Sequence, residues 1–264
     1  MIRLFIILFF AGLAFGVADS NLVAHYKMDD NADSNTVIDE KGHNGTSIRN
    51  TSARHVDGKI GGALSFNGTS DYINTNQTFQ SVFRDSFTIN VWCKADDGAN
   101  GNQWILDGYD NVHKGQITLK ISVNGKLAGV FISNNSIPQA TAIETTASFV
   151  DGQNDWKMLS LVATKVSVST GNIALYVDGQ LVKQGATVTI VFGNYTTDYN
   201  PYLGADDSTG VITSFFAGSL DNFMIFNKAL SAAEVLQLYN EANPAVTDSN
   251  SIGRLDDRRG RNRY

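Results

Sequence analysis

The stretch PYLGADDSTG, residues 201–210, places two carboxylates side by side, Asp206 and Asp207. Adjacent carboxylates repel each other, so a loop that keeps both either leaves them in water or sets them around a cation. Calcium takes six to eight oxygen ligands at about 2.3–2.6 Å, and loops supply such oxygens readily. Successive side chains of a strand face opposite ways, so the two converge only where Gly204 and Gly210 let the backbone leave the strand. Calcium and a solvated turn both remain open.

The acidic residues lack the spacing of a glycosidase. A retaining glycosidase needs two carboxyl groups about 5 Å apart, which strands usually provide from positions i and i+2 or i+4. Asp151 and Asp155 are separated in this way, but the Gly and Asn around them favour a turn. No glutamate has such a partner: Glu40, Glu144, Glu234 and Glu241. No Gly-x-Ser-x-Gly elbow occurs and the histidines lack zinc spacing, so we predict no catalytic residue and no enzyme.

The elements that must position these residues are strands. Short runs of alternating polarity, punctuated by Gly, Asn and Asp, extend from Leu22 to Phe226. Asn124-Gly125 and Asp178-Gly179 have the residue types of two-residue hairpin turns. Many antiparallel strands at roughly ten-residue spacing predict an all-β fold with two packed sheets, or a barrel.

A single short helix is expected near the C-terminus. Ser231 and Glu234 have the spacing of a capping box, in which each side chain satisfies a backbone N–H of the other residue. Val235, Leu238 and Tyr239 follow on one apolar face. Asn243-Pro244 ends the helix.

The ends of the chain predict a secreted, single-domain protein. Residues 1–18 have a positive start, an apolar run too short to span a bilayer and a small-x-small cleavage pattern, which together predict a signal peptide. Residues 19–243 are expected to form one domain, and residues 244–264 a disordered basic tail.

The net charge of −6 argues against a nucleic-acid partner. Cys93 is the only cysteine, so no internal disulfide can form.

Glycosylation is a further expectation. The sequence has six Asn-x-Ser/Thr acceptors, which weakly favour a glycoprotein: Asn44, Asn50, Asn67, Asn76, Asn134 and Asn194.

Several segments resemble the laminin-G-like and pentraxin-like branch of the concanavalin A-like lectin/glucanase superfamily. GKIGGALSFNGTSDYINT resembles the opening strands of that branch, and NIALYVDGQLVKQG its middle hairpin. PYLGADDSTG followed by FAGSLDNFMIFNKALSAAEVLQLYN resembles its closing strand and helix. The resemblance covers about residues 22–240. It implies an antiparallel two-sheet jelly-roll sandwich that binds glycans without catalysis, often with calcium.

The resemblance also implies two sets of calcium ligands. Asp206 and Asp207 stand where pentraxins bind calcium, and Asp110-Asn111 resembles the second half of that site. The second set would hold a structural calcium ion that fixes the N-terminal loop to the last strand, and it consists of Asp29, Asp39 and Asp221. Asp221 interrupts an apolar strand, where an acid is costly unless it is paired, bound to metal or hydrogen-bonded to loop N–H groups.

Aromatic faces beside polar groups hold sugars. Tyr195, Tyr199 and Tyr202 precede Asp206, and Tyr109 precedes Asp110, so these four are candidate ligand contacts, with packing at the sandwich rim as the alternative. We therefore expect a secreted, non-catalytic, calcium-dependent lectin-like domain. Its partner would be a glycan or a glycosylated protein surface, and a homo-oligomer remains open. The alternative is a structural or adhesion protein in which calcium only stabilises the fold.

Overall fold

The computed structural model describes residues 19–96, 101–109, 115–133, 140–148, 155–207 and 211–243. The expected signal peptide, residues 1–18, and the expected tail, residues 244–264, lie outside these ranges. Within them, no helix combines the length and apolar character that crossing a bilayer requires.

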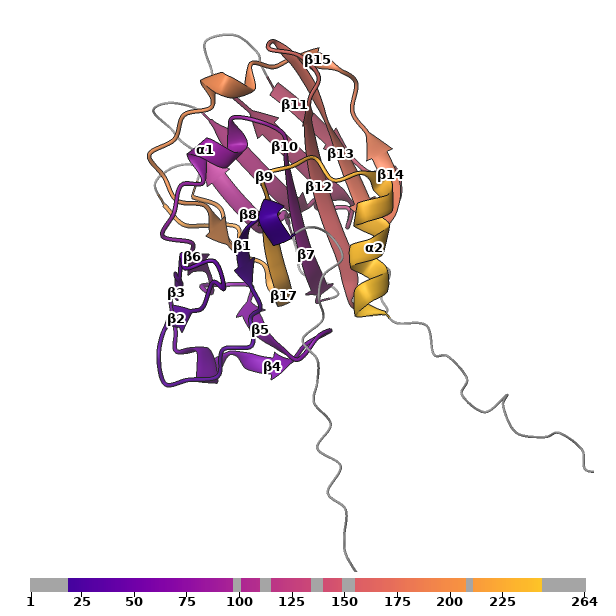
Figure 1. Ribbon diagram of the computed structural model, residues 1–264. Helices are drawn as coiled ribbons and strands as arrows, with labels where there is room; N and C mark the ends of the chain where they lie inside the picture. Colours follow the sequence, from indigo (N-terminus) through magenta and orange to yellow (C-terminus); the bar gives the residue numbers. More distant parts are fainter. Residues whose placement is uncertain are drawn as a thin grey trace, which may run out of the picture.

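The chain folds into two antiparallel sheets that face each other (Figure 1), as the strand pattern predicts. The nine-stranded sheet has the order β14-β13-β12-β7-β17-β5-β4, with β1 added to β17 and β15 to β13. Its strands are β1 Leu22–Tyr26, β4 His55–Asp57, β5 Gly62–Asn67, β7 Phe87–Ala95, β12 Lys157–Lys165, β13 Thr170–Val177, β14 Gln180–Gln184, β15 Val188–Thr189 and β17 Ala217–Phe226.

The eight-stranded sheet has the order β11-β10-β9-β8-β16-β6-β3-β2. Its strands are β2 Thr36–Val37, β3 Gly45–Ser47, β6 Ile73–Asn74, β8 Gln103–Tyr109, β9 Gln116–Ile121, β10 Leu127–Ile132, β11 Ala140–Glu144 and β16 Tyr202–Leu203. The remaining elements are helices: α1 Gln80–Phe83, α2 Ala232–Ala242, and the 3-10 turns η1 Asp19–Asn21, η2 Thr51–Ala53 and η3 Phe192–Asn194.

The two predicted hairpins form, with different turns. Asp178 and Gly179, between β13 and β14, both have positive φ, at 51° and 77°, as a primed two-residue turn requires. Between β9 and β10 Gly125 alone has positive φ, at 67°, and Ser122 accepts from its N–H. The second turn is therefore wider than the sequence predicts.

The hydrophobic core lies between the sheets because alternation sends every second side chain inward. Leu159 and Leu161 of β12 are fully buried there. Phe131 of β10, in the opposite sheet, belongs to the same core and meets Phe87 of β7 edge-on, with ring centroids 5.3 Å apart. Cys93 of β7 is buried, and burial raises the pKa of its thiol. A buried, protonated thiol is a packing group rather than a nucleophile.

Helix α2 covers the outer face of the nine-stranded sheet (Figure 1). Ser231 caps it, accepting from the Glu234 N–H while Glu234 accepts from the Ser231 N–H, which confirms the predicted capping box. Val235 is buried against this sheet, and the ring of Tyr239 stacks on Trp92 with centroids 5.7 Å apart. Among the described residues no comparable helix lies on the outer face of the eight-stranded sheet.

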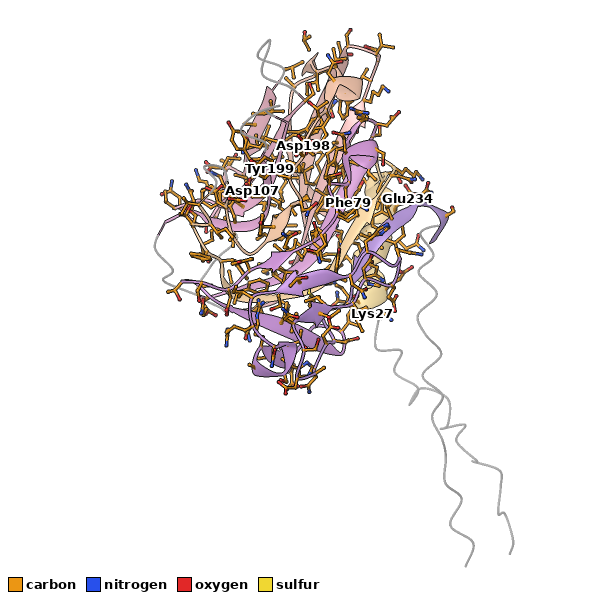
Figure 2. All side chains as sticks on the ribbon, turned by 90° about the vertical axis from the view of Figure 1, so that its left-hand side faces the viewer. Lys27, Phe79, Asp107, Asp198, Tyr199 and Glu234 are labelled. Carbon is orange, nitrogen blue, oxygen red and sulfur yellow. The ribbon has the colours of Figure 1, made fainter. Side chains whose placement is uncertain are left out.

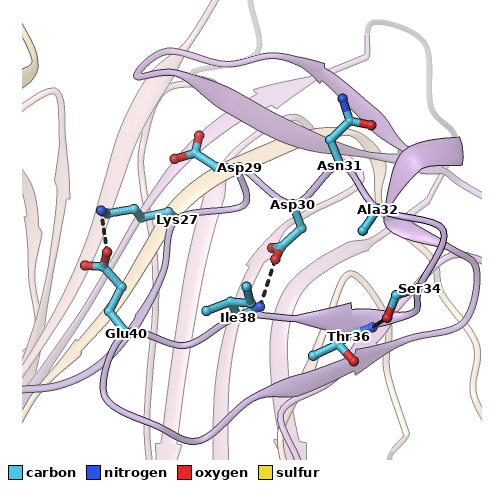
Figure 3. A pocket seen from close by; sticks show the side chains of 9 residues that line it. All are labelled: Lys27, Asp29, Asp30, Asn31, Ala32, Ser34, Thr36, Ile38 and Glu40. Atoms are coloured by element: carbon cyan, nitrogen blue, oxygen red, sulfur yellow. Dashed lines mark hydrogen bonds and ion pairs between the residues drawn. The ribbon is translucent and has the colours of Figure 1, made fainter.

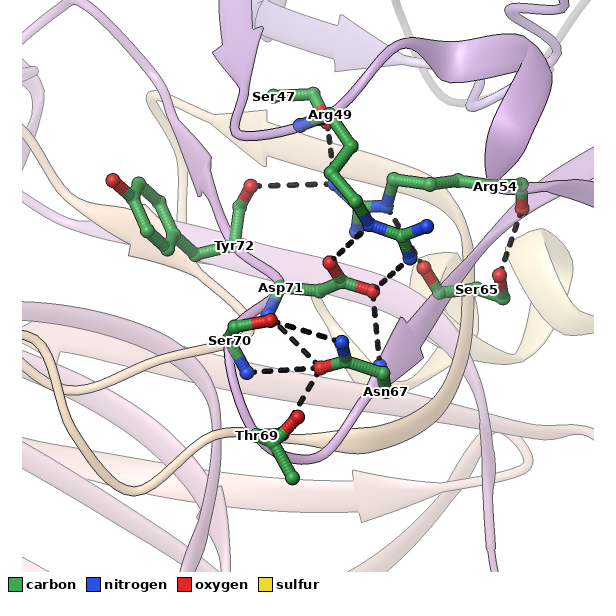
Figure 4. A network of polar contacts seen from close by, with 9 residues as sticks. All are labelled: Ser47, Arg49, Arg54, Ser65, Asn67, Thr69, Ser70, Asp71 and Tyr72. Atoms are coloured by element: carbon green, nitrogen blue, oxygen red, sulfur yellow. Dashed lines mark hydrogen bonds and ion pairs between the residues drawn. The ribbon is translucent and has the colours of Figure 1, made fainter.

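A buried guanidinium joins the two sheets beside β5 (Figure 4). Arg54 is 1% exposed and donates to the Ser65 carbonyl of β5 at 2.9 Å and to Ser47 Oγ of β3 at 2.5 Å. Burial lowers its pKa to about 10. Asp71, fully buried, supplies the compensating charge and accepts two hydrogen bonds from Arg49.

Candidate functional site

One row of paired residues crosses the outer face of the eight-stranded sheet. Strand register joins Tyr202 to Asn74 on one side and to Asp107 on the other. Asp107 in turn pairs with Thr118. Because the adjacent row, which includes Leu203, is buried in the core, strand alternation directs this row away from the core. The row is mostly polar, with an aromatic ring at its centre.

Tyr202 and Tyr72 form an aromatic corner on this face. Their rings lie edge-on with centroids 5.5 Å apart, and both side chains are half-buried. Asn74 Nδ2 donates to the Tyr202 hydroxyl at 3.3 Å. Burial and the charge of Asp207 raise the pKa of that hydroxyl. A half-exposed ring beside an amide and a carboxylate is the combination that holds a sugar ring by its face and its hydroxyl groups.

Three carboxyl groups gather beside this corner. Asp107 is 1% exposed and Asp206 is 8% exposed, whereas Asp207 is half-buried. Thr118 Oγ1 donates to Asp107 Oδ1 at 2.6 Å, but Asp107 Oδ2 is buried with no hydrogen-bond partner. Burial, reinforced by the charge of Asp206, raises the pKa of Asp107 to about 8. A proton or a cation at this buried oxygen would relieve the repulsion.

A second aromatic group lies further along the same face. Trp104 of β8 pairs with Lys120 of β9, and the Lys120 Nζ lies 4.5 Å from the centroid of the indole ring. Both side chains are half-buried. Tyr109, at the end of β8, shares the face of Asp107 because it is two residues away on the same strand. Tyr109, a predicted ligand contact, therefore lies on the same face as Trp104.

Sequence reasoning missed Asp107 and Trp104. Asp107 lies in the apolar strand QWILDGY, so the argument applied to Asp221, that an acid in an apolar strand needs a partner, would have identified it. Trp104 also lies in a strand pattern, where sequence alone favours a place in the core. A register shift between Trp104 and Leu106 breaks the alternation, so its face cannot be deduced from sequence.

The other predicted tyrosines behave differently. Tyr195 corrects the prediction: it is fully buried, stacked on Phe131 with centroids 5.7 Å apart, so it packs the core and cannot contact a ligand. Tyr199 is 38% exposed in the loop before β16 and lies with Asp198 on the same side of the molecule as Asp107 (Figure 2). Asp110 and Asn111 follow Tyr109 but lie outside the described residues.

Asp221 and Asp29 hold one loop from two sides. Asp221, fully buried on β17, accepts from the Ile60 N–H at 2.8 Å, and Asp29 accepts from the Gly62 N–H at 2.6 Å. Of the three explanations offered for an acid in this apolar strand, the structure shows the hydrogen bond from a loop N–H group. Burial raises the pKa of Asp221 to about 7, and the charge of Asp29 adds to this effect.

Asp39 holds its own loop. Its carboxylate accepts from the backbone N–H groups of His25, Lys41 and His43 at 2.6–3.1 Å. In the described part of the chain, no three His, Cys, Asp or Glu side chains form a group that could hold a metal ion. Asp29, Asp39 and Asp221 therefore do not form one metal-binding group. Calcium at the other predicted set stays a prediction, because Asp110 and Asn111 lie outside the described residues.

We expect the protein to lose stability as the pH rises from about 5 to about 8. The pKa of Asp107 is raised to about 8 and that of Asp221 to about 7, both above the unfolded value of about 4. The contribution of such a group is complete below its unfolded pKa and is lost as the pH rises through the folded one. Melting temperatures measured in chelator across this range test the expectation. Asp107→Asn should flatten the decline, and an unchanged decline would contradict it.

The two antiparallel sheets and their strand order define a jelly-roll sandwich. The family model described as concanavalin A-like lectin/glucanases superfamily matches residues 67–236, more than half of the chain. The chain belongs to this family. The match confirms the predicted resemblance and does not include the N-terminal loop that carries Asp29 and Asp39.

Solved structures share the fold. The CBM40 domain of the Ruminococcus gnavus IT-sialidase, bound to α2,3-sialyllactose, is 17% identical with a TM-score of 0.53, over 67% of this chain and 96% of that one. Domain 4 of AbnA, a GH43 extracellular arabinanase from Geobacillus stearothermophilus, in complex with arabinotriose, is 22% identical with a TM-score of 0.57, over 83% and 98%. The botulinum neurotoxin type G receptor binding domain is 18% identical with a TM-score of 0.58, over 84% of this chain and 51% of that one. No curated protein matches the sequence.

Proposed function

We propose that this protein binds a carbohydrate on the outer face of the eight-stranded sheet. The observation that carries the proposal is the row that places Tyr202 and Asn74 next to the carboxyl groups around Asp107. The CBM40 domain with sialyllactose and the arabinanase domain with arabinotriose support it, because both have this fold and bind sugars. The role is binding alone. The interacting carboxyl groups of Asp107 and Asp206 are too buried to reach a glycosidic bond.

We further propose that calcium supports this site. The observation that fits a cation is the buried Asp107 carboxyl group, whose Oδ2 accepts no hydrogen bond and whose pKa is raised further by the neighbouring Asp206 carboxylate. Asp107 and Asp206 would supply the first ligands, and because they do not form a metal-binding group with Asp207, the ion requires further oxygens from Asp110 and Asn111, which follow β8 in sequence. The bound ion would neutralise the carboxylates and offer coordination positions to sugar hydroxyl groups. Secretion, predicted from residues 1–18, is part of the same proposal.

A glycan array probed with and without calcium tests the binding. We expect a sugar signal that a chelator weakens, and Tyr202→Ala should weaken binding about tenfold, since loss of one aromatic contact costs on the order of 1 kcal/mol. Tyr202→Phe keeps the ring and should retain most of the affinity. Leu181→Ala, on the edge strand of the other sheet, is the matched control.

The array also separates the alternatives. Absence of any sugar signal, together with a melting temperature that calcium raises, would favour the structural or adhesion function in which calcium only stabilises the fold. A sugar signal that is the same with chelator would remove calcium from the proposal and leave the carbohydrate site.

A further inference from the structure

A pocket lies in the N-terminal loop, away from the outer-face row. It has a volume of about 470 Å³, within the range of small-molecule sites. Its lining comes entirely from the stretch 27–40 (Figure 3): Lys27, Asp29, Asp30, Asn31, Ala32, Ser34, Thr36, Ile38 and Glu40. Figure 2 places Lys27 well apart from Asp107. The two sites therefore do not share residues.

Local contacts hold the pocket open. Asp30 Oδ1 accepts from the Ile38 N–H at 3.1 Å, which ties the two arms of the loop together across the hollow. Lys27 forms an ion pair with Glu40 at one end. Asp29 is fixed from outside the loop by the Gly62 N–H at 2.6 Å. The walls are thus set before any ligand arrives, which lowers the entropy cost of binding.

The charge of the lining is unbalanced. Lys27 and Glu40 neutralise each other, and neither Asp29 nor Asp30 forms an ion pair with any part of the chain that the structure describes. Asp30 is half-buried, and burial together with the charge of Asp29 raises its pKa, although the hydrogen bond from the Ile38 N–H and the nearby His55 oppose this effect. Two adjacent carboxylates that form no ion pair within the described residues favour a positively charged ligand.

The rest of the lining is suited to a small hydroxylated body. Asn31, Ser34 and Thr36 carry hydrogen-bonding side chains, and Ser34 Oγ is already oriented by the Thr36 N–H at 3.1 Å. Ile38 is 57% exposed and offers an apolar surface to the C–H face of a ring.

We propose that this pocket binds a small polyhydroxylated ligand bearing a protonated primary amine, such as an unacetylated amino sugar. The ammonium group lies between Asp29 and Asp30, the hydroxyl groups meet Asn31 and Ser34, and the ring lies on Ile38. This site is independent of the proposed carbohydrate site on the eight-stranded sheet.

Titration of the full chain with glucosamine at about pH 6.5, followed through backbone amide signals, tests the proposal. We expect saturable shifts at Ser34, Thr36 and Ile38, and at least tenfold weaker binding of glucose and N-acetylglucosamine, which lack the charge. Asp30→Asn keeps the acceptor for the Ile38 N–H and should weaken glucosamine binding about tenfold. If that variant fails to fold, Asp29→Asn takes its place, since it likewise keeps its acceptor for Gly62.

Two controls make the result decisive. Asp33→Asn removes the same charge from the same loop outside the pocket lining and should bind glucosamine normally. Tyr202→Ala should also bind it normally, so failure of one site is distinguishable from failure of the other. Any one of four results would overturn the proposal. Glucose could bind as well as glucosamine, or Asp33→Asn could weaken binding as much as Asp30→Asn. Glucosamine could give no saturable shift, or calcium chloride alone could give the same shifts while glucosamine gives none.

Discussion

Replacing Asp71 by alanine should lower the free energy of unfolding by about 3 kcal/mol, because it removes the carboxylate that pairs with Arg49 and offsets the charge of the buried Arg54 (Figure 4). Asp71 is fully buried, accepts from Arg49 Nε at 2.7 Å and from the Asn67 N–H at 3.1 Å, and offsets the charge of Arg54. Without it, a guanidinium that is 1% exposed lacks compensation. Urea unfolding followed by tryptophan fluorescence measures the loss.

The partner substitution provides the control. Arg49 is 42% exposed at its side chain, so Arg49→Ala should cost much less than Asp71→Ala, about 1 kcal/mol. Equal losses in the two variants would show that the exposed ion pair, rather than compensation of the buried Arg54, stabilises this corner. Because Arg54 donates hydrogen bonds to both sheets, Asp71→Ala should also loosen the pairing of β3 with β6.

Replacing Gly204 by alanine should cost about 2–3 kcal/mol and should also weaken carbohydrate binding. Gly204 has a φ of 84°, and an added Cβ would lie 2.3 Å from the ring of Phe66. Phe66 is 2% exposed and packs edge-on against Phe216, so it cannot move aside. The energetic cost of the strained φ and the cost of the overlap with Phe66 add together. Since Gly204 lies between Tyr202 and Asp206, the displaced backbone would move both.

Gly42→Ala is the matched comparison. Gly42 has a similar φ of 94°, but nothing lies within 4 Å of an added Cβ. Its cost should be that of the backbone strain alone, about 1 kcal/mol. Chemical denaturation of both variants separates the two contributions. A Gly204 variant no less stable than the Gly42 variant would show that the Phe66 ring can yield.

Local chemistry made several features of this protein predictable. The capping box of Ser231 and Glu234 depends on residues three apart, and the turn at Asp178-Gly179 on two residues that tolerate positive φ. Both form as expected. The burial of Cys93 follows from alternation within one uninterrupted strand, which is again a local pattern.

The candidate site was only partly predictable, because its residues meet across strands far apart in sequence. Asp206 was identified from its neighbour in the chain, but its contact with Asp107 depends on the pairing of β16 with β8, a register that no local pattern encodes. Tyr195 and Tyr202 come from the same short stretch of sequence, yet Tyr195 packs against Phe131 in the core and Tyr202 lies on the outer face.

The sequence by itself determined the strand pattern, the terminal helix and the membership of a sandwich family, because alternation, turn residues and caps act over a few positions. Tertiary structure alone decided which face each tyrosine occupies, which carboxyl groups share a low-dielectric environment and that residues 27–40 enclose a pocket. Burial and charge at a site depend on every strand and loop that packs there, and those neighbours are set by strand order and register.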